Sequence, residues 1–153
     1  MIKICFVCHG NICRSPMAEF IMKSLVEKEG RANEFFIESK ATHTDEIWNG
    51  VGSHIYPPAQ KELKRNGIPF DKSKRAVLLD EGDCDKYDLF IGMDFENIRF
   101  MNRILGKKAE PKIHKLLEYT GSDGDVYDPW YSDNFELAYN SIYKGCKTLL
   151  ETL

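Results

Sequence analysis

The sequence predicts an α/β fold, a single doubly wound domain whose four-stranded parallel sheet has the order 2-1-3-4 and carries helices on both faces. Short apolar runs typical of buried strands alternate along the chain with segments of helical apolar spacing. No internal repeat, linker or low-complexity run interrupts this alternation. A chain of 153 residues is also long enough to bury one sizeable core. We therefore expect one domain over residues 1–153.

The chain opens with a predicted strand and helix. Residues 2–7, IKICFV, are almost entirely apolar, as expected of a strand covered on both faces. Residues 16–27 have the apolar spacing of a helix that ends near Gly30. We expect Pro16 at the first helical position, where a missing N–H costs nothing, and Ser15 as the cap.

A second strand and helix follow. Residues 35–39, FFIES, predict a strand, and residues 57–67 predict a helix with proline at its start and glycine just past its end. The intervening segment 43–56 shows neither period and is predicted as a loop.

The remaining elements complete the sheet. Residues 87–93 predict a third strand, Asp94 is placed to cap a helix that runs to about Leu105, and residues 112–117 predict a weaker fourth strand. Residues 135–150 have the spacing of a closing amphipathic helix.

Composition narrows the class of protein. A formal net charge of −3 argues against general nucleic-acid binding. No stretch approaches the roughly 20 apolar residues of a membrane span, and no signal-peptide pattern is present. An odd number of cysteines argues against a disulfide framework and a zinc site. Reduced thiols predict a cytoplasmic protein, although the sequence leaves open an export route that needs no signal peptide. The cysteines are Cys5, Cys8, Cys13, Cys84 and Cys146.

Ligands of a doubly wound sheet bind at the carboxyl ends of its strands. Here that edge receives four segments: residues 8–15, residues 39–56, Asp94 with its neighbours, and residues 118–133. We therefore expect the functional residues to lie in these segments.

The segment CHGNICRSP, residues 8–16, has the character of a phosphate loop. It joins a strand to a helix N-terminus, and Gly10 allows the backbone N–H groups to turn toward one centre. Arg14 supplies a planar fork for two phosphate oxygens. Cys8 lies in the same positive field, which favours its thiolate as a nucleophile, and Ser15 is placed to donate a hydrogen bond to it. The alternative is an ordinary turn with a buried Cys8 and a surface Arg14.

The opening motif resembles the signature of the low-molecular-weight protein tyrosine phosphatases. The similarity begins with VCHGNICRSPMAE at residues 7–19 and extends over the whole chain. A second specific match is Asp128-Pro129-Trp130-Tyr131, and supporting matches are Gly67-Ile68-Pro69, Asp88-Leu89, and Met93-Asp94 with Asn97.

The resemblance implies an enzyme that hydrolyses phosphotyrosine-type aryl phosphate monoesters on proteins through a cysteinyl-phosphate. Cys8 would be the nucleophile, Arg14 and the loop N–H groups would bind phosphate, and Asp128 would be the general acid and base. The alternative for Asp128-Pro129 is a simple turn. Neither a metal nor a cofactor is implied, and the four histidines lack metal-ligand spacing. Implied substrate-binding residues are His9, Gly10, Asn11, Ile12, Cys13, Ser15, Trp48, Trp130 and Tyr131, with Asn11, Ser15 and Ser39 supporting the loop.

The expected partner is a tyrosine-phosphorylated protein, with inorganic phosphate as product and neither nucleic acid nor membrane involved. A weak homodimer is left open. Two other enzymes share this fold: protein arginine phosphatases have threonine where this chain has Ile12, and arsenate reductases need two further cysteines where only Cys84 lies. A non-enzymatic phosphate-binding or redox-sensing module is the alternative of a different class.

The sequence departs from the family pattern around the expected site. His9 stands where the family often has a small or aliphatic residue, and Lys40 and His43 replace small residues. Asp45 stands where the family often has an aromatic residue. Trp48 is then a candidate for the missing aromatic wall. Lys72 stands where many members have histidine. Cys13 matches the family's second loop cysteine, and a reversible disulfide with Cys8 is a hypothesis that the match suggests.

Overall fold

The computed structural model describes all 153 residues and is built on a sheet of four parallel strands. The strands are β1 (Ile2–Cys8), β2 (Phe35–Ala41), β5 (Leu89–Gly92) and β6 (Ile113–Lys115), in the spatial order β2-β1-β5-β6. Counted along this sheet alone, the order is 2-1-3-4. The predicted α/β fold and strand order are confirmed.

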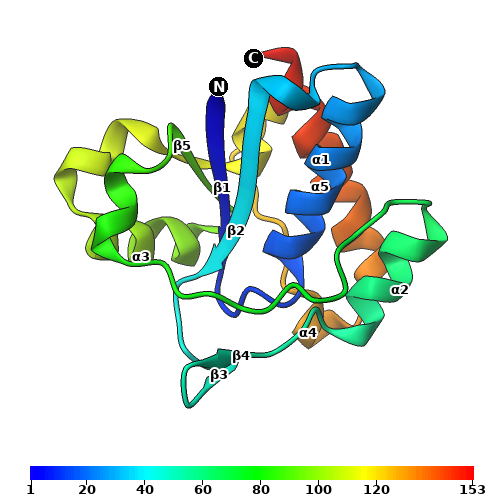
Figure 1. Ribbon diagram of the computed structural model, residues 1–153, viewed down its shortest axis with the longest axis horizontal. Coiled ribbons are helices and arrows are strands. Elements are labelled where there is room, and N and C mark those ends of the chain that lie inside the picture. Colours follow the sequence, from blue (N-terminus) through cyan, green and yellow to red (C-terminus); the bar gives the residue numbers. More distant parts are fainter.

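Helices cover both faces of the sheet because β1 is apolar on both sides. Its alternate side chains Ile4 and Phe6 belong to the larger apolar core, while Cys5 and Val7 belong to the smaller one. The larger core is shared with α1 (Arg14–Lys28) and α5 (Phe135–Glu151), with α2 (Pro57–Arg65) against its edge, and the smaller with α3 (Phe95–Leu105). Figure 1 shows α1 and α5 on one side of the strands and α3 on the other.

The strands end together at one edge of the sheet. Cys8 at the end of β1 lies beside Ala41 at the end of β2, and Val7 lies beside Gly92 at the end of β5. In Figure 1 this edge faces away from both chain termini, toward the short strands β3 and β4 and the helix α4. The segments that follow the strands therefore meet at one place.

Helix α1 begins earlier than predicted, and this corrects two expectations. Its first residue is Arg14 and the residue before it, Cys13, makes no side-chain cap, so Ser15 lies inside the helix and is not its cap. Pro16 is the third helical residue rather than the first. It is tolerated there because the first four N–H groups of a helix have no partner within the helix.

The predicted loop 43–56 contains a small hairpin that the sequence did not indicate. Strands β3 (Ile47–Trp48) and β4 (Val51–Gly52) pair antiparallel, and Asn49 and Gly50 between them have φ values of 51° and 79°. Two positive φ values are typical of the two-residue turn that matches the twist of a hairpin. Each strand has only two residues, too few for a period of two to be seen in the sequence.

The fourth strand is shorter than predicted. Strand β6 ends at Lys115, and residues 116 and 117, expected to continue it, begin the 3₁₀ helix Leu116–Thr120. A further short helix, α4 (Pro129–Ser132), follows Asp128 within the segment predicted as loop. No helix in the structure combines the length and the apolar character needed to cross a membrane.

Candidate active site

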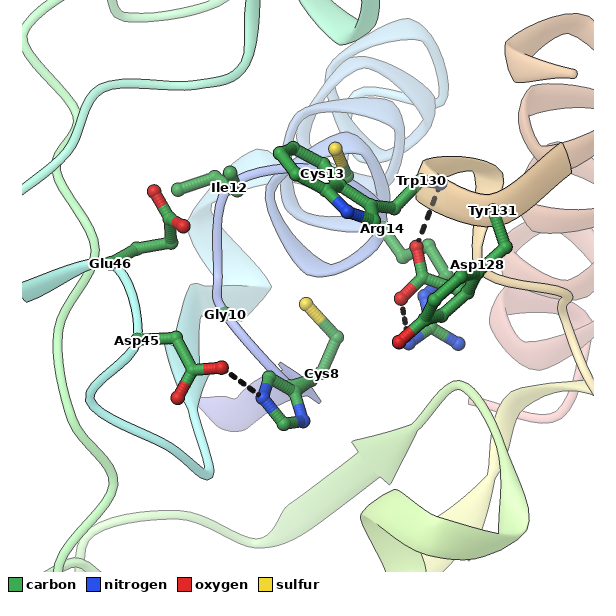
Figure 2. A pocket seen from close by; sticks show the side chains of 11 residues that line it. Cys8, Gly10, Ile12, Cys13, Arg14, Asp45, Glu46, Asp128, Trp130 and Tyr131 are labelled. Carbon is green, nitrogen blue, oxygen red and sulfur yellow. Dashed lines mark hydrogen bonds and ion pairs between the residues drawn. The ribbon is translucent and has the colours of Figure 1, made fainter. Parts of the chain in front are cut away.

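A cavity of about 210 Å³ opens at the carboxyl edge of the sheet. It is bounded by the loop between β1 and α1, by the segment just before β3, and by the start of α4 (Figure 2). These three segments lie far apart in the sequence and meet because their strands end at the same edge. The lining residues are Cys8, His9, Gly10, Ile12, Cys13, Arg14, Asp45, Glu46, Asp128, Trp130 and Tyr131.

The sulfur of Cys8 is surrounded by hydrogen-bond donors. The Ser15 hydroxyl lies 3.0 Å from it, and the backbone N–H groups of Asn11 and Ser15 donate to it at 3.3 and 3.4 Å. Only 3% of Cys8 is exposed, so few water molecules compete for these donors. Such an arrangement stabilises a sulfur anion at the floor of the cavity.

Asn11 holds the loop in this shape from beneath. Its side-chain NH₂ donates to Ser15 Oγ at 2.8 Å and to Ser39 Oγ at 2.9 Å, while its Oδ1 accepts from the Val77 N–H at 3.0 Å. The backbone of Asn11 has φ 59°, a left-handed conformation that asparagine tolerates better than most residues. Because Ser15 already accepts from Asn11, its single proton is free to point at Cys8.

Arg14 is fixed by three oxygen atoms. Its Nη1 donates to Asp94 Oδ2 at 2.6 Å and to the Val126 carbonyl at 2.8 Å, and its Nη2 lies 3.6 Å from Asp128 Oδ2. Burial opposes the charge of this guanidinium, but Cys8 and Asp94 outweigh it, so the pKa of Arg14 is raised above its usual value. Arg14 is thus a permanent cation with a fixed orientation beside the sulfur.

Asp128 is placed by the start of α4. One of its carboxylate oxygens accepts the Trp130 N–H at 3.0 Å, as an N-cap, and the other faces Arg14. Its side chain is 29% exposed, which leaves the carboxyl group open to the cavity. Trp130 and Tyr131 line the same side, as Figure 2 shows, and the ring of Tyr56 packs against Trp130 at 5.1 Å.

His9 and Asp45 line the opposite side of the cavity, and His43, which does not line it, contacts His9. His9 Nε2 lies 2.8 Å from Asp45 Oδ2, and the His9 ring stacks on His43 with centroids 3.9 Å apart. Burial and the neighbouring His9 lower the pKa of His43. The hydrogen bond from His9 lowers the pKa of Asp45. Asp45 and His43 therefore hold the His9 ring in place beside the cavity.

Not every residue singled out in the sequence lies at the cavity. Trp48 is on the hairpin with 70% of its surface exposed and does not line the cavity. Lys72 is exposed and forms neither a hydrogen bond nor an ion pair, and Lys40 pairs instead with the buried Asp83 at 2.8 Å. Cys13 does line the cavity, and burial, with Cys8 nearby, raises the pKa of its thiol.

Four residues contribute to the site in ways that the sequence did not predict. Glu46 lines the cavity, and Asp94, expected at this edge as a helix cap, also orients Arg14. Glu19 and Lys74 lie beneath the loop, where Ser39 Oγ donates to Glu19 at 2.6 Å and Lys74 Nζ donates to the Ser39 carbonyl at 2.9 Å. The position of Asp94 at the end of a strand was the one available signal. No group of three or more histidine, cysteine or acidic side chains is arranged to hold a metal ion.

Comparisons with known proteins agree with this geometry. The sequence profile of the family described as "Low molecular weight phosphotyrosine protein phosphatase" matches residues 3–153. The low molecular weight protein-tyrosine-phosphatase YfkJ of Bacillus subtilis is 39% identical, and the alignment covers 100% of this chain and 96% of the YfkJ chain. The crystal structure of SP-PTP from Streptococcus pyogenes superposes with a TM-score of 0.88 at 38% identity, covering 100% of this chain and 93% of the other. A mutant of the arginine phosphatase YwlE of Bacillus subtilis, which carries a phosphorylated serine in place of its active-site cysteine, superposes with a TM-score of 0.85 at 28% identity, covering 99% of this chain and 95% of the other.

Proposed function

Because the chain belongs to the low molecular weight phosphotyrosine protein phosphatase family, and is therefore a phosphatase, we propose that it hydrolyses phosphotyrosine on proteins through a cysteinyl-phosphate. One observation carries this proposal. The Cys8 sulfur, surrounded by three donors, shares one cavity with the fixed Arg14 guanidinium and the partly exposed Asp128 carboxyl group. The side chains proposed as nucleophile, phosphate ligand and proton donor thus share one cavity.

In the first step the Cys8 thiolate attacks phosphorus. An S–P bond forms as the bond from phosphorus to the phenolic oxygen breaks, and Asp128 transfers its proton to that oxygen. The loop N–H groups and Arg14 hold the three equatorial oxygens, on which the charge of the transition state is spread. Trp130 and Tyr131 are placed to pack against the aromatic ring of the leaving group.

In the second step water releases the phosphate. Asp128, now a carboxylate, accepts a proton from the attacking water as the new O–P bond forms and the S–P bond breaks. The electron pair of that bond returns to Cys8 as a thiolate, and inorganic phosphate leaves. The Ser15 hydroxyl, 3.0 Å from the sulfur, stabilises the charge that appears there.

The arginine phosphatase among the structural neighbours makes phosphoarginine the second candidate substrate. The walls of the cavity support phosphotyrosine, because Ile12, Trp130 and Tyr131 offer an apolar and aromatic surface to a phenyl ring. Phosphoarginine would place a polar guanidinium against the same surface. Peptides that carry the two phosphorylated residues in one sequence context compare the candidates directly.

The test is hydrolysis of an aryl phosphate and of both peptides in excess chelator with the thiols reduced. We expect Cys8→Ser to abolish turnover and Asp128→Asn to lower it by about 10²-fold or more. Asp133→Asn is the matched control, since Asp133 caps the other end of α4 with φ 58°, a conformation that asparagine also adopts. Turnover that survives Cys8→Ser contradicts the mechanism, and faster hydrolysis of the phosphoarginine peptide contradicts the substrate.

A further inference from the structure

A continuous chain of hydrogen bonds runs from the nucleophile to a buried carboxylate on α1. Ser15 contacts Cys8 at 3.0 Å and accepts from Asn11 at 2.8 Å. Asn11 donates its second side-chain proton to Ser39 at 2.9 Å, and Ser39 donates its only proton to Glu19 at 2.6 Å. Every proton in this chain therefore has one assigned acceptor.

The directions of these hydrogen bonds are fixed at both ends. Asn11 cannot turn its amide over without losing the bond from the Val77 N–H to its Oδ1. Glu19 as a carboxylate only accepts, so the Ser39 proton points to it and a Ser39 lone pair faces Asn11. If the Ser39 proton turned toward Asn11, it would meet the amide NH₂ and displace it from Ser15. The orientation of the Ser15 proton toward Cys8 thus depends on an acceptor four residues further along α1.

Lys74 compensates the charge of that acceptor. Its Nζ lies 3.7 Å from Glu19 Oε1 and donates to the Ser39 carbonyl at 2.9 Å, and only 14% of its side chain is exposed. Burial lowers the pKa of this ammonium and Glu19 acts in the opposite direction. The second cation, Lys23 at 2.6 Å from Glu19 Oε2, has 45% of its side chain exposed and is therefore better screened by water. A buried carboxylate without a cation is strongly disfavoured.

We propose that Lys74 and Glu19 are positioning residues for the phosphatase reaction, which act through Ser39, Asn11 and Ser15 to keep a proton directed at the Cys8 sulfur. The inference rests on the proposed function, because it concerns the step in which Cys8 leaves phosphorus as a thiolate. Neither residue lines the cavity that holds Cys8, so neither touches the substrate.

The test separates the two chemical steps by rapid mixing with an aryl phosphate that has a good leaving group. The initial burst of phenol reports formation of the cysteinyl-phosphate, and the steady rate that follows reports its breakdown. We expect Lys74→Met to slow breakdown roughly two- to thirtyfold, the range of coupling through such networks, and to slow the burst less. Lys74→Arg, which keeps the charge, should restore the ratio of the two rates.

Lys40→Met is the matched control. Lys40 has the same 14% exposure and pairs at 2.8 Å with Asp83, which is fully buried, but no hydrogen bond joins Asp83 to the site. Loss of a buried ion pair should lower the stability of both variants. Only Lys74→Met should change the ratio of breakdown to burst.

A double-mutant cycle shows whether Lys74 acts through Ser15. In a Ser15→Ala background the proton directed at Cys8 is already gone, so Lys74→Met should slow breakdown no further. The inference is overturned if the two effects on breakdown multiply, or if Lys40→Met changes the ratio as much as Lys74→Met does. A wild-type enzyme without Cys8-dependent turnover would instead overturn the proposed function.

Chemical rescue keeps the test informative if the Met variant folds poorly. Lys74 and Glu19 both line a second cavity of about 500 Å³ outside the active site, so a small cation can reach the position of the lost ammonium. Ethylammonium should speed breakdown in Lys74→Ala, whereas tetramethylammonium, which cannot donate a hydrogen bond, should not. Equal effects of the two cations would contradict the inference.

Discussion

Replacement of Ser15 by alanine tests the assignment of the sulfur's hydrogen bonds most directly. Of the three donors to Cys8, the Ser15 hydroxyl is the nearest, and Ser15→Ala leaves the two backbone N–H groups at 3.3 and 3.4 Å in place. A hydrogen bond to a charged group is worth about 1.5–3 kcal/mol. Its loss lowers the rate constant roughly 10- to 160-fold for a step whose transition state would have the full benefit of this hydrogen bond.

Loss of the Ser15 hydrogen bond affects formation and breakdown of the cysteinyl-phosphate differently. Attack consumes the negative charge on sulfur, so the hydroxyl stabilises the starting state more than the transition state, and its removal does not slow the attack of a thiolate. Breakdown creates that charge, so its removal raises the barrier. We expect Ser15→Ala to lower the steady rate by roughly 10- to 160-fold. The initial burst of phenol should be preserved and therefore become more distinct.

The assay is rapid mixing with an aryl phosphate that has a good leaving group, together with urea unfolding. Ser15→Ala also deprives the Asn11 amide of one acceptor, which should cost about 1–3 kcal/mol of stability. Ser39→Ala deprives the same amide of its other acceptor, and its urea unfolding reports how much stability such a loss costs. Equal slowing of burst and steady rate in Ser15→Ala would refute the reasoning, because it would show that the hydroxyl does not distinguish the two states of the sulfur.

Three further predictions concern redox chemistry, packing and pH. If Cys13 is the resolving thiol, peroxide should inactivate the wild type reversibly, with loss of two free thiols and release of water from the Cys8 sulfenic acid. The same treatment should inactivate Cys13→Ala irreversibly. A wild type that loses only one thiol contradicts this prediction. Gly145→Ala in α5 would normally stabilise a helix by about 0.5–1 kcal/mol, but the new Cβ would lie 2.5 Å from Leu116 Cγ, so we expect urea unfolding to show a loss of about 1–3 kcal/mol and not a gain. Because the pKa of His43 is lowered in the folded chain, the unfolded chain binds this proton more tightly, and the free energy of unfolding falls as pH drops below about 6.5. His43→Gln should therefore lose less free energy of unfolding between pH 7 and pH 5 than the wild type. An unchanged pH dependence contradicts this prediction.

The parts of the site that the sequence predicted are formed by residues close together in the sequence. The loop from Cys8 to Arg14 needs only seven consecutive residues between a strand and a helix, and both flanking elements have clear apolar patterns. The same patterns predicted the parallel sheet with helices on both faces, since alternating strands and helices leave few architectures. Asp128 was found by resemblance rather than by pattern, because nothing local distinguishes it from a turn residue.

The parts that were missed depend on contacts between distant segments. The Val126 carbonyl that holds Arg14 is a backbone atom and leaves no trace in the side-chain sequence. In the sequence Glu19 is one acidic residue on a predicted helix, and only its contacts with Ser39 and Lys74 in the folded chain distinguish it. The predicted cap at Ser15 was wrong because its hydroxyl is engaged by Asn11 and Cys8, a competition that local rules for helix ends do not include.

The two carboxylates beside Arg14 lie at different distances from it, and this difference gives them different roles. Asp94 approaches at 2.6 Å and its other oxygen caps α3 by accepting the Asn97 N–H at 2.8 Å, so it cannot leave without unpairing a helix end. Asp128 stands 3.6 Å away and is held by one N–H at the start of a helix of four residues. A phosphate dianion that binds Arg14 competes with both, and the weaker contact yields first. We therefore expect substrate binding to release Asp128 from Arg14 toward the leaving oxygen while Asp94 keeps the guanidinium in place.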